Sequence, residues 1–402
     1  MKSKKKMILV LNCGSSSLKY KLIQMPDEKE CICGEAQRVG IKTNKKSVIK
    51  HVVFEKETVV YKDLPSHVCA FNEIMKLLEK DHLSNPDLKI AAFAHRYVHP
   101  GKFFTDTTKV TKRAIKKLEK TLELAPIHNP IAFELIKKCM DAYASVPQYI
   151  VFDTTFHKTI PASLATYALP LDVIEKYGIR KMGFHGLSHK YVMQQACRFL
   201  DKKETTQRII SCHLGTGGAS ICAIKNGESI NNSMGFTPLE GLIMNTRCGD
   251  VDLGLVFYIM FKEQYSIEKI NSILNNKSGI LGLFEDSSDL RDVIHKTKHE
   301  DKAHKTFKMY IKRIKKYIGF YSLLLKKSDI LIFTDSIGQE SSDVRKKVVQ
   351  GLEFLGISID QDKNIKYTEG IKDISSDNSQ TKILIVPTNE EIMIAKEAYK
   401  EF

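Results

Sequence analysis

Short apolar runs with β character alternate along this chain with stretches whose apolar residues recur at helical spacing. In the first half the pattern predicts strands at residues 7–11, 18–23 and 90–94, β-rich sequence at 48–61, and helices at 67–80, 111–124 and 131–144. In the second half it predicts strands at 209–212, 219–224 and 330–334, and helices at 251–261, 267–274 and 303–325. The repeated alternation predicts an α/β protein, and the similarity of the halves indicates duplication.

The length of 402 residues exceeds what one hydrophobic core normally supports, so two domains are expected. No low-complexity linker separates the halves, and a hinge near Asp153 is the predicted boundary. We expect an N-terminal domain at 1–153 and a C-terminal domain at 154–389, with a helix at 390–402 packing back on the first domain.

The net charge of +15 raises the question of a nucleic-acid partner. The lysines are spread along predicted helices, such as 109–120 and 296–316, without interleaved aromatic residues. This pattern favours solvated lysine faces over a nucleic-acid surface, although the positive field still attracts small polyanions.

Several features of the sequence exclude a membrane-spanning protein and a zinc-knuckle protein. No apolar run approaches the roughly 18 residues of a membrane span. The apolar run 7–11 follows the basic segment 1–6, as in a signal peptide. It is shorter than the ~7 to 15 residues that the apolar region of a signal peptide needs. The nine cysteines form no Cys-x-x-Cys pair, so a reducing cytoplasm is the expected location.

Two of the predicted strands lead into small loops rich in glycine and hydroxyl groups. The first loop is NCGSSSLK (12–19) and the second is HLGTGGAS (213–220). Backbone N–H groups and hydroxyls in such loops can surround an anion. Neither loop has the spacing of a Walker motif or of a dinucleotide fold, and either alone could be an ordinary turn. Together they predict a phosphotransferase.

Four charged side chains lie at strand ends or in turns, where the local structure does not require a charge. Arg96 ends a predicted strand, Asp153 follows apolar residues, His185 lies between glycines, and Arg247 occupies a tight turn. Phosphoryl transfer requires cations for the developing charge and a carboxylate to organise metal or substrate.

At these residues the chain resembles the acetate kinase family. The matching segments, in family order, are LNCGSSSLK (11–19), HRYVH (95–99), LAPIHNP (124–130), FDT (152–154), GFHG (183–186), SMGFTPLEG (233–241), TRCGD (246–250), SDLRD (288–292) and PTNEE (387–391). The resemblance implies the duplicated α/β fold, ribonuclease H-like, that acetate kinases share with sugar kinases, Hsp70 and actin. It also implies an active site in the interdomain cleft and a homodimer.

The resemblance implies a role for each matched residue. Arg96 and Arg247 would bind the carboxylate and the transferring phosphoryl group, and His185 would stabilise that group. Asp153 would position acetate or the magnesium shell. Asn12 and Glu390 would hold Mg²⁺, or Mn²⁺ in its place, partly through water.

The resemblance also implies two binding surfaces. Phosphate or donor binding falls to Ser15, Ser17, Lys19, His213, Gly215, Thr216, Gly217, Gly218, Asp289, Arg291, Ser336 and Gly338. The acetate pocket would be formed by Val98, Ile127, Phe184 and Pro238. These apolar residues favour a small carboxylate, whereas butyrate kinase would need a roomier pocket and a sugar kinase a polar one.

The departures from the family concern the phosphoryl donor. Thr216 replaces a family asparagine, and Asp335 and Ser336 replace glycines beside the expected nucleoside. These substitutions resemble the branch that uses pyrophosphate, so we expect acetate and acetyl phosphate to be interconverted with pyrophosphate and phosphate rather than with ATP and ADP. An ordinary ATP-dependent acetate kinase is the alternative, and a non-catalytic regulatory relative is a third.

Overall fold

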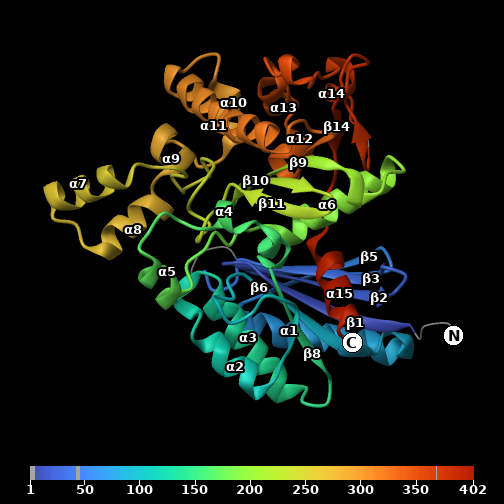
Figure 1. Cartoon of the computed structure of the whole chain (residues 1–402). Helices are drawn as coiled ribbons and strands as arrows, with labels where there is room; N and C mark the ends of the chain where they lie inside the picture. The colour runs from blue at the N-terminus through green and yellow to red at the C-terminus, as the bar shows by residue number, and fades with distance from the viewer. Residues whose placement is uncertain (1–4, 42–45, 368) are drawn as a thin grey trace. The chain divides into compact units, whose positions relative to one another are not determined.

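The computed structural model describes residues 5–41, 46–367 and 369–402. The chain divides into two compact units. The first unit comprises Met1–Thr155 and Asn389–Phe402, and the second comprises Phe156–Thr388. Each unit is built on one mixed β-sheet with helices on its faces (Figure 1).

The sheet of the first unit has the strand order β5-β4-β3-β2-β1-β6-β8-β7. Its strands are β1 (Lys6–Cys13), β2 (Ser17–Met25), β3 (Lys29–Gln37), β4 (Ser47–Val53), β5 (Lys56–Lys62), β6 (Ile90–Tyr97), β7 (Thr108–Lys109) and β8 (Gln148–Phe152). Strands β1, β2 and β3 are antiparallel neighbours, whereas β1, β6 and β8 run parallel. The carboxyl ends of these three parallel strands therefore lie at one edge of the sheet.

Helices cover both faces of this sheet. On one face, Leu9 and Leu11 of β1 share a core with α1 (His67–Ser84) and α3 (Asn129–Ala142). The other face is packed by α15 (Glu390–Lys400), which contacts β1, β2, β6 and β8. Because side chains alternate along a strand, Asn12 points to the face opposite Leu11. This alternation directs Asn12 toward α15.

The sheet of the second unit has the order β11-β10-β9-β12-β14-β13. Its strands are β9 (Arg208–Leu214), β10 (Ala219–Lys225), β11 (Glu228–Asn232), β12 (Ile330–Thr334), β13 (Lys372–Asp373) and β14 (Lys382–Ile385). Strands β9, β10 and β11 are antiparallel, and β9, β12 and β14 run parallel. This order and these directions match those of β1, β2, β3, β6 and β8, so the two sheets repeat one topology.

Helices α6 (Gly186–Phe199) and α11 (Asp301–Leu325) cover the two faces of the second sheet (Figure 1). The other helices are α2 (Lys112–Glu119), α4 (Ala162–Ala165), α5 (Leu171–Tyr177), α7 (Leu253–Glu263), α8 (Ile267–Asn276), α9 (Gly279–Phe284), α10 (Leu290–Lys296), α12 (Asp335–Glu340), α13 (Ser342–Val349) and α14 (Gln361–Ile365). Among the described residues, none of these helices is both long and apolar enough to cross a bilayer.

The structure corrects two of the predicted elements. The predicted helix 111–124 ends after Glu119, because the buried Thr121 hydroxyl bonds to the carbonyl of Leu118 and to Tyr97. The β-rich stretch 48–61 is two strands, which turn at Phe54 and Glu55 with positive φ.

The two predicted loops are shorter than the sequence indicated. His213 pairs with Ser220 and Leu214 with Ala219, which leaves only residues 215–218 between β9 and β10. Asn12 pairs with Lys19 across β1 and β2 in the same way. Each loop is therefore a tight hairpin turn.

Candidate active site

Three candidate residues of the first unit come together at the ends of its parallel strands. Asn12 lies in β1, Arg96 in β6 and Asp153 directly after β8. Arg96 Nη1 donates to Asn12 Oδ1 at 3.2 Å, and Arg96 Nη2 donates to Asp153 Oδ2 at 3.1 Å. The guanidinium thereby fixes the positions of both side chains.

The first turn of α15 adds two carboxylates to this group. Asn389 begins the helix by accepting a hydrogen bond from the Ile392 N–H, which is favourable N-capping chemistry. Glu390 Oε2 lies 3.9 Å from Arg96 Nε, and buried Glu391 accepts a 2.8 Å hydrogen bond from the Asn12 amide. Glu391 was not among the predicted site residues.

Burial alone would lower the pKa of Arg96, but Asp153 and Glu390 hold that pKa above its ordinary value. Arg96 Nε has no hydrogen-bond partner among the described residues. This N–H is buried, and the carboxylate oxygen Glu390 Oε2 lies 3.9 Å from it.

The first-unit site fits a hydrated divalent cation. Asp153, Glu390 and Glu391 carry more negative charge than the single guanidinium neutralises, and the available ligand atoms are oxygens. Hard cations such as Mg²⁺ prefer oxygen ligands and keep several waters. Among the described residues, no three His, Cys, Asp or Glu side chains converge on one ion position. Water and substrate oxygens would therefore complete the coordination.

In the second unit, the glycine turn after β9 gathers a separate group of candidate residues. Gly215 N–H donates to the Gly218 carbonyl at 3.1 Å, and Thr216 N–H donates to Ser336 Oγ at 3.1 Å. A Cβ added to Gly218 would lie 3.4 Å from His185 and 3.5 Å from Arg247. Glycine therefore leaves open a space that a histidine and an arginine both face.

Arg247 brings a cation to this space. Its Nη1 donates to the Pro238 carbonyl at 2.9 Å and its Nη2 to the Gly217 carbonyl at 3.1 Å. Arg247 forms no ion pair within the part of the chain that the structure describes, and burial lowers its pKa. A half-buried guanidinium bound only to neutral carbonyls is well suited to receive an anion.

His185 is held by a buried hydrogen-bond network. It has a positive φ of 55° at the start of α6, and its Nδ1 lies 2.9 Å from Ser220 Oγ. The same hydroxyl lies 2.9 Å from His189 Nε2, whose Nδ1 lies 2.9 Å from Ser211 Oγ. Burial, reinforced by the other histidines, lowers the pKa of His189 far enough to keep it neutral. Ser220 and His189 thus orient the His185 ring, and neither was a predicted site residue.

Asp335 occupies the space beside the glycine turn. It has a φ of 62°, a conformation that glycine adopts more easily, and its carboxylate lies 3.0 Å from His213 Nε2. A Cβ on Gly215 would overlap this carboxylate, so Gly215 and Asp335 fit only as a pair. His213 in turn stacks on His185 with ring centroids 4.1 Å apart.

The remaining predicted residues are more scattered. Ser15 and Lys19 are exposed and Ser17 is half-buried, whereas Gly338 is buried within α12. Asp289 caps α10 and pairs with the exposed Arg291 at 2.6 Å. Of the predicted acetate pocket, Val98 and Phe184 are buried, Pro238 is half-buried and Ile127 is 48% exposed.

The sequence of this chain is similar to those of known proteins. It matches the Acetokinase family over residues 7–396. Acetate kinases of Halothermothrix orenii and Alkaliphilus metalliredigens are each 43% identical to it, over 97% of this chain and 98% of each relative.

Solved structures agree with this assignment. The crystal structure of Porphyromonas gingivalis acetate kinase has a TM-score of 0.88 at 38% identity and covers 98% of this chain and 99% of its own. A Francisella tularensis propionate kinase has a TM-score of 0.88 at 36% identity, with 98% of both chains covered. The predicted duplicated α/β fold and the family resemblance are both confirmed. The chain belongs to the acetokinase family.

Proposed function

We propose that this protein catalyses reversible phosphoryl transfer between acetate and a phosphate donor, with acetyl phosphate as the product. The observation that carries the proposal is the open space at Gly218, which His185 and Arg247 both face. Two cation-forming or hydrogen-donating side chains beside a glycine turn suit the charge that develops on a transferring phosphoryl group. Family membership supports the same reaction.

The first unit would bind the reacting carboxylate or phosphoryl oxygens. Arg96 is pre-oriented by Asn12 and Asp153, so little side-chain entropy is lost when an anion binds. The acetate carboxylate is already an anion and needs no general base to activate it. Catalysis then consists of alignment and charge neutralisation, as is general for phosphoryl transfer.

In the second unit, Arg247 and His185 would stabilise the phosphoryl group during transfer. Ser220 Oγ lies 2.9 Å from Nδ1 of His185, and Nε2 is on the side of Gly218, where it would donate to a phosphoryl oxygen. The role of His185 therefore depends on the buried Ser220–His189 pair as well as on the ring itself.

A divalent cation is expected from the family, and we propose Mg²⁺, with Mn²⁺ able to replace it. Asn12 and Glu390 would hold it through water, with Glu391 fixing the Asn12 amide. When bound, the cation neutralises charge on the donor phosphates.

For the acceptor we propose acetate, with propionate tolerated. Val98, Phe184, Pro238 and Ile127 present apolar side chains of moderate size. One additional methylene changes discrimination by only ~1–3 kcal/mol. The similarity to a propionate kinase supports the same tolerance.

For the donor, the comparisons support ATP and ADP, because the relatives carry the plain name acetate kinase. One observation favours pyrophosphate and phosphate as a second candidate. The Asp335 carboxylate is packed against Gly215, where it adds bulk and negative charge beside the phosphate turn. A nucleoside next to that turn would meet this carboxylate, whereas a bare phosphate would not.

The experiment that tests the donor compares two acceptors of the acetyl phosphate phosphoryl group. The specificity constant is measured for ADP and for inorganic phosphate with the same enzyme preparation. A clear preference for ADP identifies an ordinary acetate kinase and rejects the pyrophosphate candidate. A clear preference for phosphate does the reverse.

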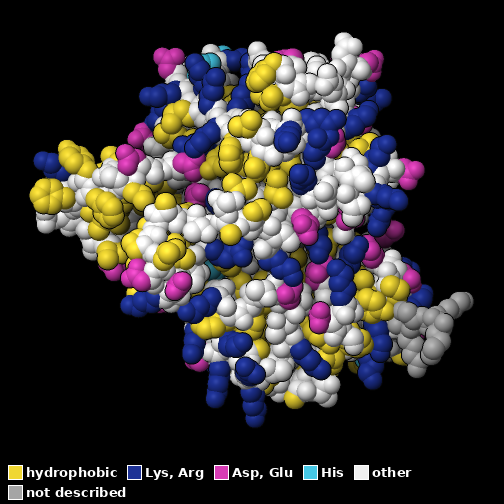
Figure 2. Space-filling model, in the orientation of Figure 1, with side chains coloured by type: hydrophobic (Ala, Val, Ile, Leu, Met, Phe, Trp, Pro, Cys, Tyr) yellow, Lys and Arg dark blue, Asp and Glu magenta, His cyan; other side chains and the backbone are white. Residues whose placement is uncertain are grey.

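We also propose a homodimer. Helix α7 has no buried residue, and it exposes Leu253, Phe257 and Phe261 at 70%, 68% and 73%. Figure 2 shows apolar side chains gathered over α7 and α8. A second copy of the chain would cover them, and sedimentation of Phe257→Glu as a monomer would support this interface.

The cytoplasmic location stays a prediction.

A further inference from the structure

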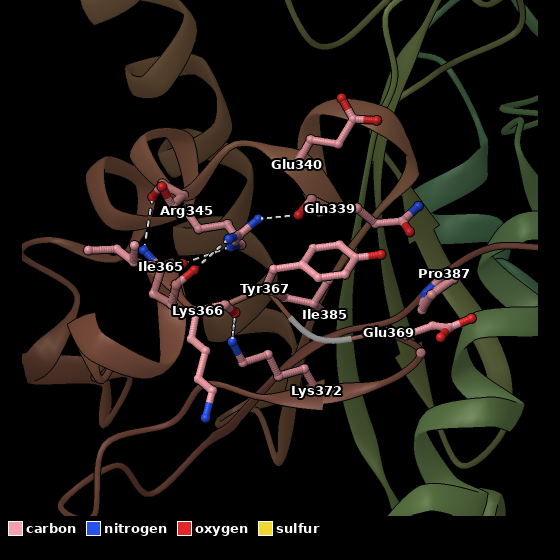
Figure 3. Close-up of a pocket in the computed structure, with 13 residues that line it drawn as sticks. Gln339, Glu340, Arg345, Ile365, Lys366, Tyr367, Glu369, Lys372, Ile385 and Pro387 are labelled. Carbon is pink, nitrogen blue, oxygen red and sulfur yellow. Dashed lines mark hydrogen bonds between the residues drawn. The ribbon is translucent and has the colours of Figure 1, made fainter.

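A cavity of about 560 Å³ lies in the second unit, at the junction of α12, α13, α14 and strand β14. Its volume is that of a small-molecule site. Figure 3 shows that it is lined from one side by Arg345 and from the others by Tyr367, Lys372 and Ile385. None of these residues belongs to the candidate active site.

The wall of this cavity contains a buried cation. Arg345 is 3% exposed, and its guanidinium donates to Asn364 Oδ1, to the Asn364 carbonyl, and to the carbonyls of Gly338 and Gln339. These contacts use four of its five N–H groups. Among the described residues no carboxylate pairs with it. A buried cation without a counter-ion is costly, and a bound anion would remove that cost.

Lys372 adds a second positive charge at the same wall. Its ammonium group donates to the carbonyl of Lys366, and burial together with repulsion from Arg345 and Lys366 lowers its pKa. Two carboxylates lie at the rim of the cavity, and Glu369 points away from Arg345 in Figure 3. Glu340 lies 3.7 Å from Arg291, and Figure 3 shows it pointing away from Arg345.

The cavity also offers an aromatic surface. Tyr367 is 88% exposed, and its ring lies across the cavity between Arg345 and Ile385 (Figure 3). A large exposed aromatic ring beside two cations suits a ligand that has both a flat apolar part and an anionic group.

We propose that this cavity binds a phosphomonoester that carries an aromatic ring, with Arg345 and Lys372 on the phosphate and Tyr367 on the ring. The position links the cavity to the phosphate turn of the candidate active site. Arg345 holds the end of α12 through Gly338 and Gln339, and Ser336 at the start of that helix accepts from Thr216. A ligand on Arg345 therefore changes the KM for the donor. This second effect rests on the proposed function, whereas binding does not.

The test is isothermal titration calorimetry with AMP as the probe and ribose 5-phosphate as the probe without the ring. Wild-type protein should bind AMP more tightly than ribose 5-phosphate, because only AMP can stack on Tyr367. Lys372→Gln should weaken AMP binding about tenfold, as expected for loss of one charge-assisted hydrogen bond. Lys346→Gln removes the same charge from an exposed site on α13 outside the cavity, and should leave the Kd unchanged.

Arg247→Ala separates the cavity from the candidate active site. AMP binding that survives Arg247→Ala and weakens in Lys372→Gln supports the proposal. Binding that is lost in Arg247→Ala and retained in Lys372→Gln overturns it, as does the absence of AMP binding at millimolar concentration. Should Lys372→Gln fail to fold, Tyr367→Ala provides the same test at an exposed residue. Calorimetry decides the binding even if no donor supports turnover.

Discussion

Replacing Arg96 tests the electrostatic design of the first-unit site. Arg96→Met keeps much of the side-chain volume but removes the cation that pairs with Asp153 at 3.1 Å. The Asp153 side chain is 2% exposed and that of Arg96 16%. Removing one partner of a buried pair costs about 3–5 kcal/mol, and the partial exposure of Arg96 places this case at about 3 kcal/mol. For a unit of roughly 170 residues, this lowers the Tm by about 6–12 °C.

The assay is thermal unfolding of Arg96→Met beside Arg96→Met/Asp153→Asn. The double variant also removes the Asp153 charge and should recover more than half of the lost stability. Lys62→Met serves as the control in the same unit, because its 2.7 Å pair with Glu73 is 47% exposed on the lysine side. It should cost at most about 1 kcal/mol. A double variant as unstable as Arg96→Met would refute the assignment of the loss to the broken Arg96–Asp153 pair.

Three further predictions concern catalysis, pH and the donor. Arg247→Ala should lower kcat about 100-fold with an unchanged circular dichroism spectrum, and near-normal turnover would show that the arginine is structural. Burial lowers the pKa of His95 to about 4, so the unfolded state binds more protons below pH ~6.5, and stability should fall by about 2 kcal/mol between pH 7 and 5. Urea unfolding of His95→Gln should show a smaller loss, and equal losses would contradict this cause. Asp335→Gly should raise the ratio of kcat/KM for ADP to that for phosphate about tenfold, because a repelling carboxylate is removed, and an unchanged ratio would reject a role for Asp335 in donor choice.

Much of the fold could be predicted because buried strands appear in the sequence as short, nearly continuous apolar runs. The strands that carry the candidate residues were recognised for β1, β6, β9 and β12, whose buried runs are nearly continuous. Strand β3 was missed, since its sequence KECICGEAQ mixes charged and small residues. Hydrophobic periodicity does not reveal such a strand, because β3 is held by its pairing with β2 and β4 rather than by a continuous apolar run.

The candidate site was predicted less completely. Arg96, Asp153 and Asn12 meet because three parallel strands end at one edge, a consequence of topology. The contact of Asn12 with Glu391 was missed, because one residue along a helix changes the direction of a side chain by about 100°. That angle is set by how α15 packs.

The network behind His185 also lay beyond sequence reasoning. Ser220 and His189 come from β10 and α6, and only tertiary packing brings them within 2.9 Å. The positive φ of Asp335 is likewise a property of the folded turn.

The most direct test of the account measures the formation of acetyl phosphate. Purified protein is incubated with acetate and Mg²⁺, in parallel with ATP or with pyrophosphate, and the product is trapped with hydroxylamine. Arg247→Ala is run beside it as the variant that lacks the second-unit cation. The account predicts hydroxamate from acetate with at least one donor, and about 100-fold less from the variant. No hydroxamate with either donor would contradict the proposed function.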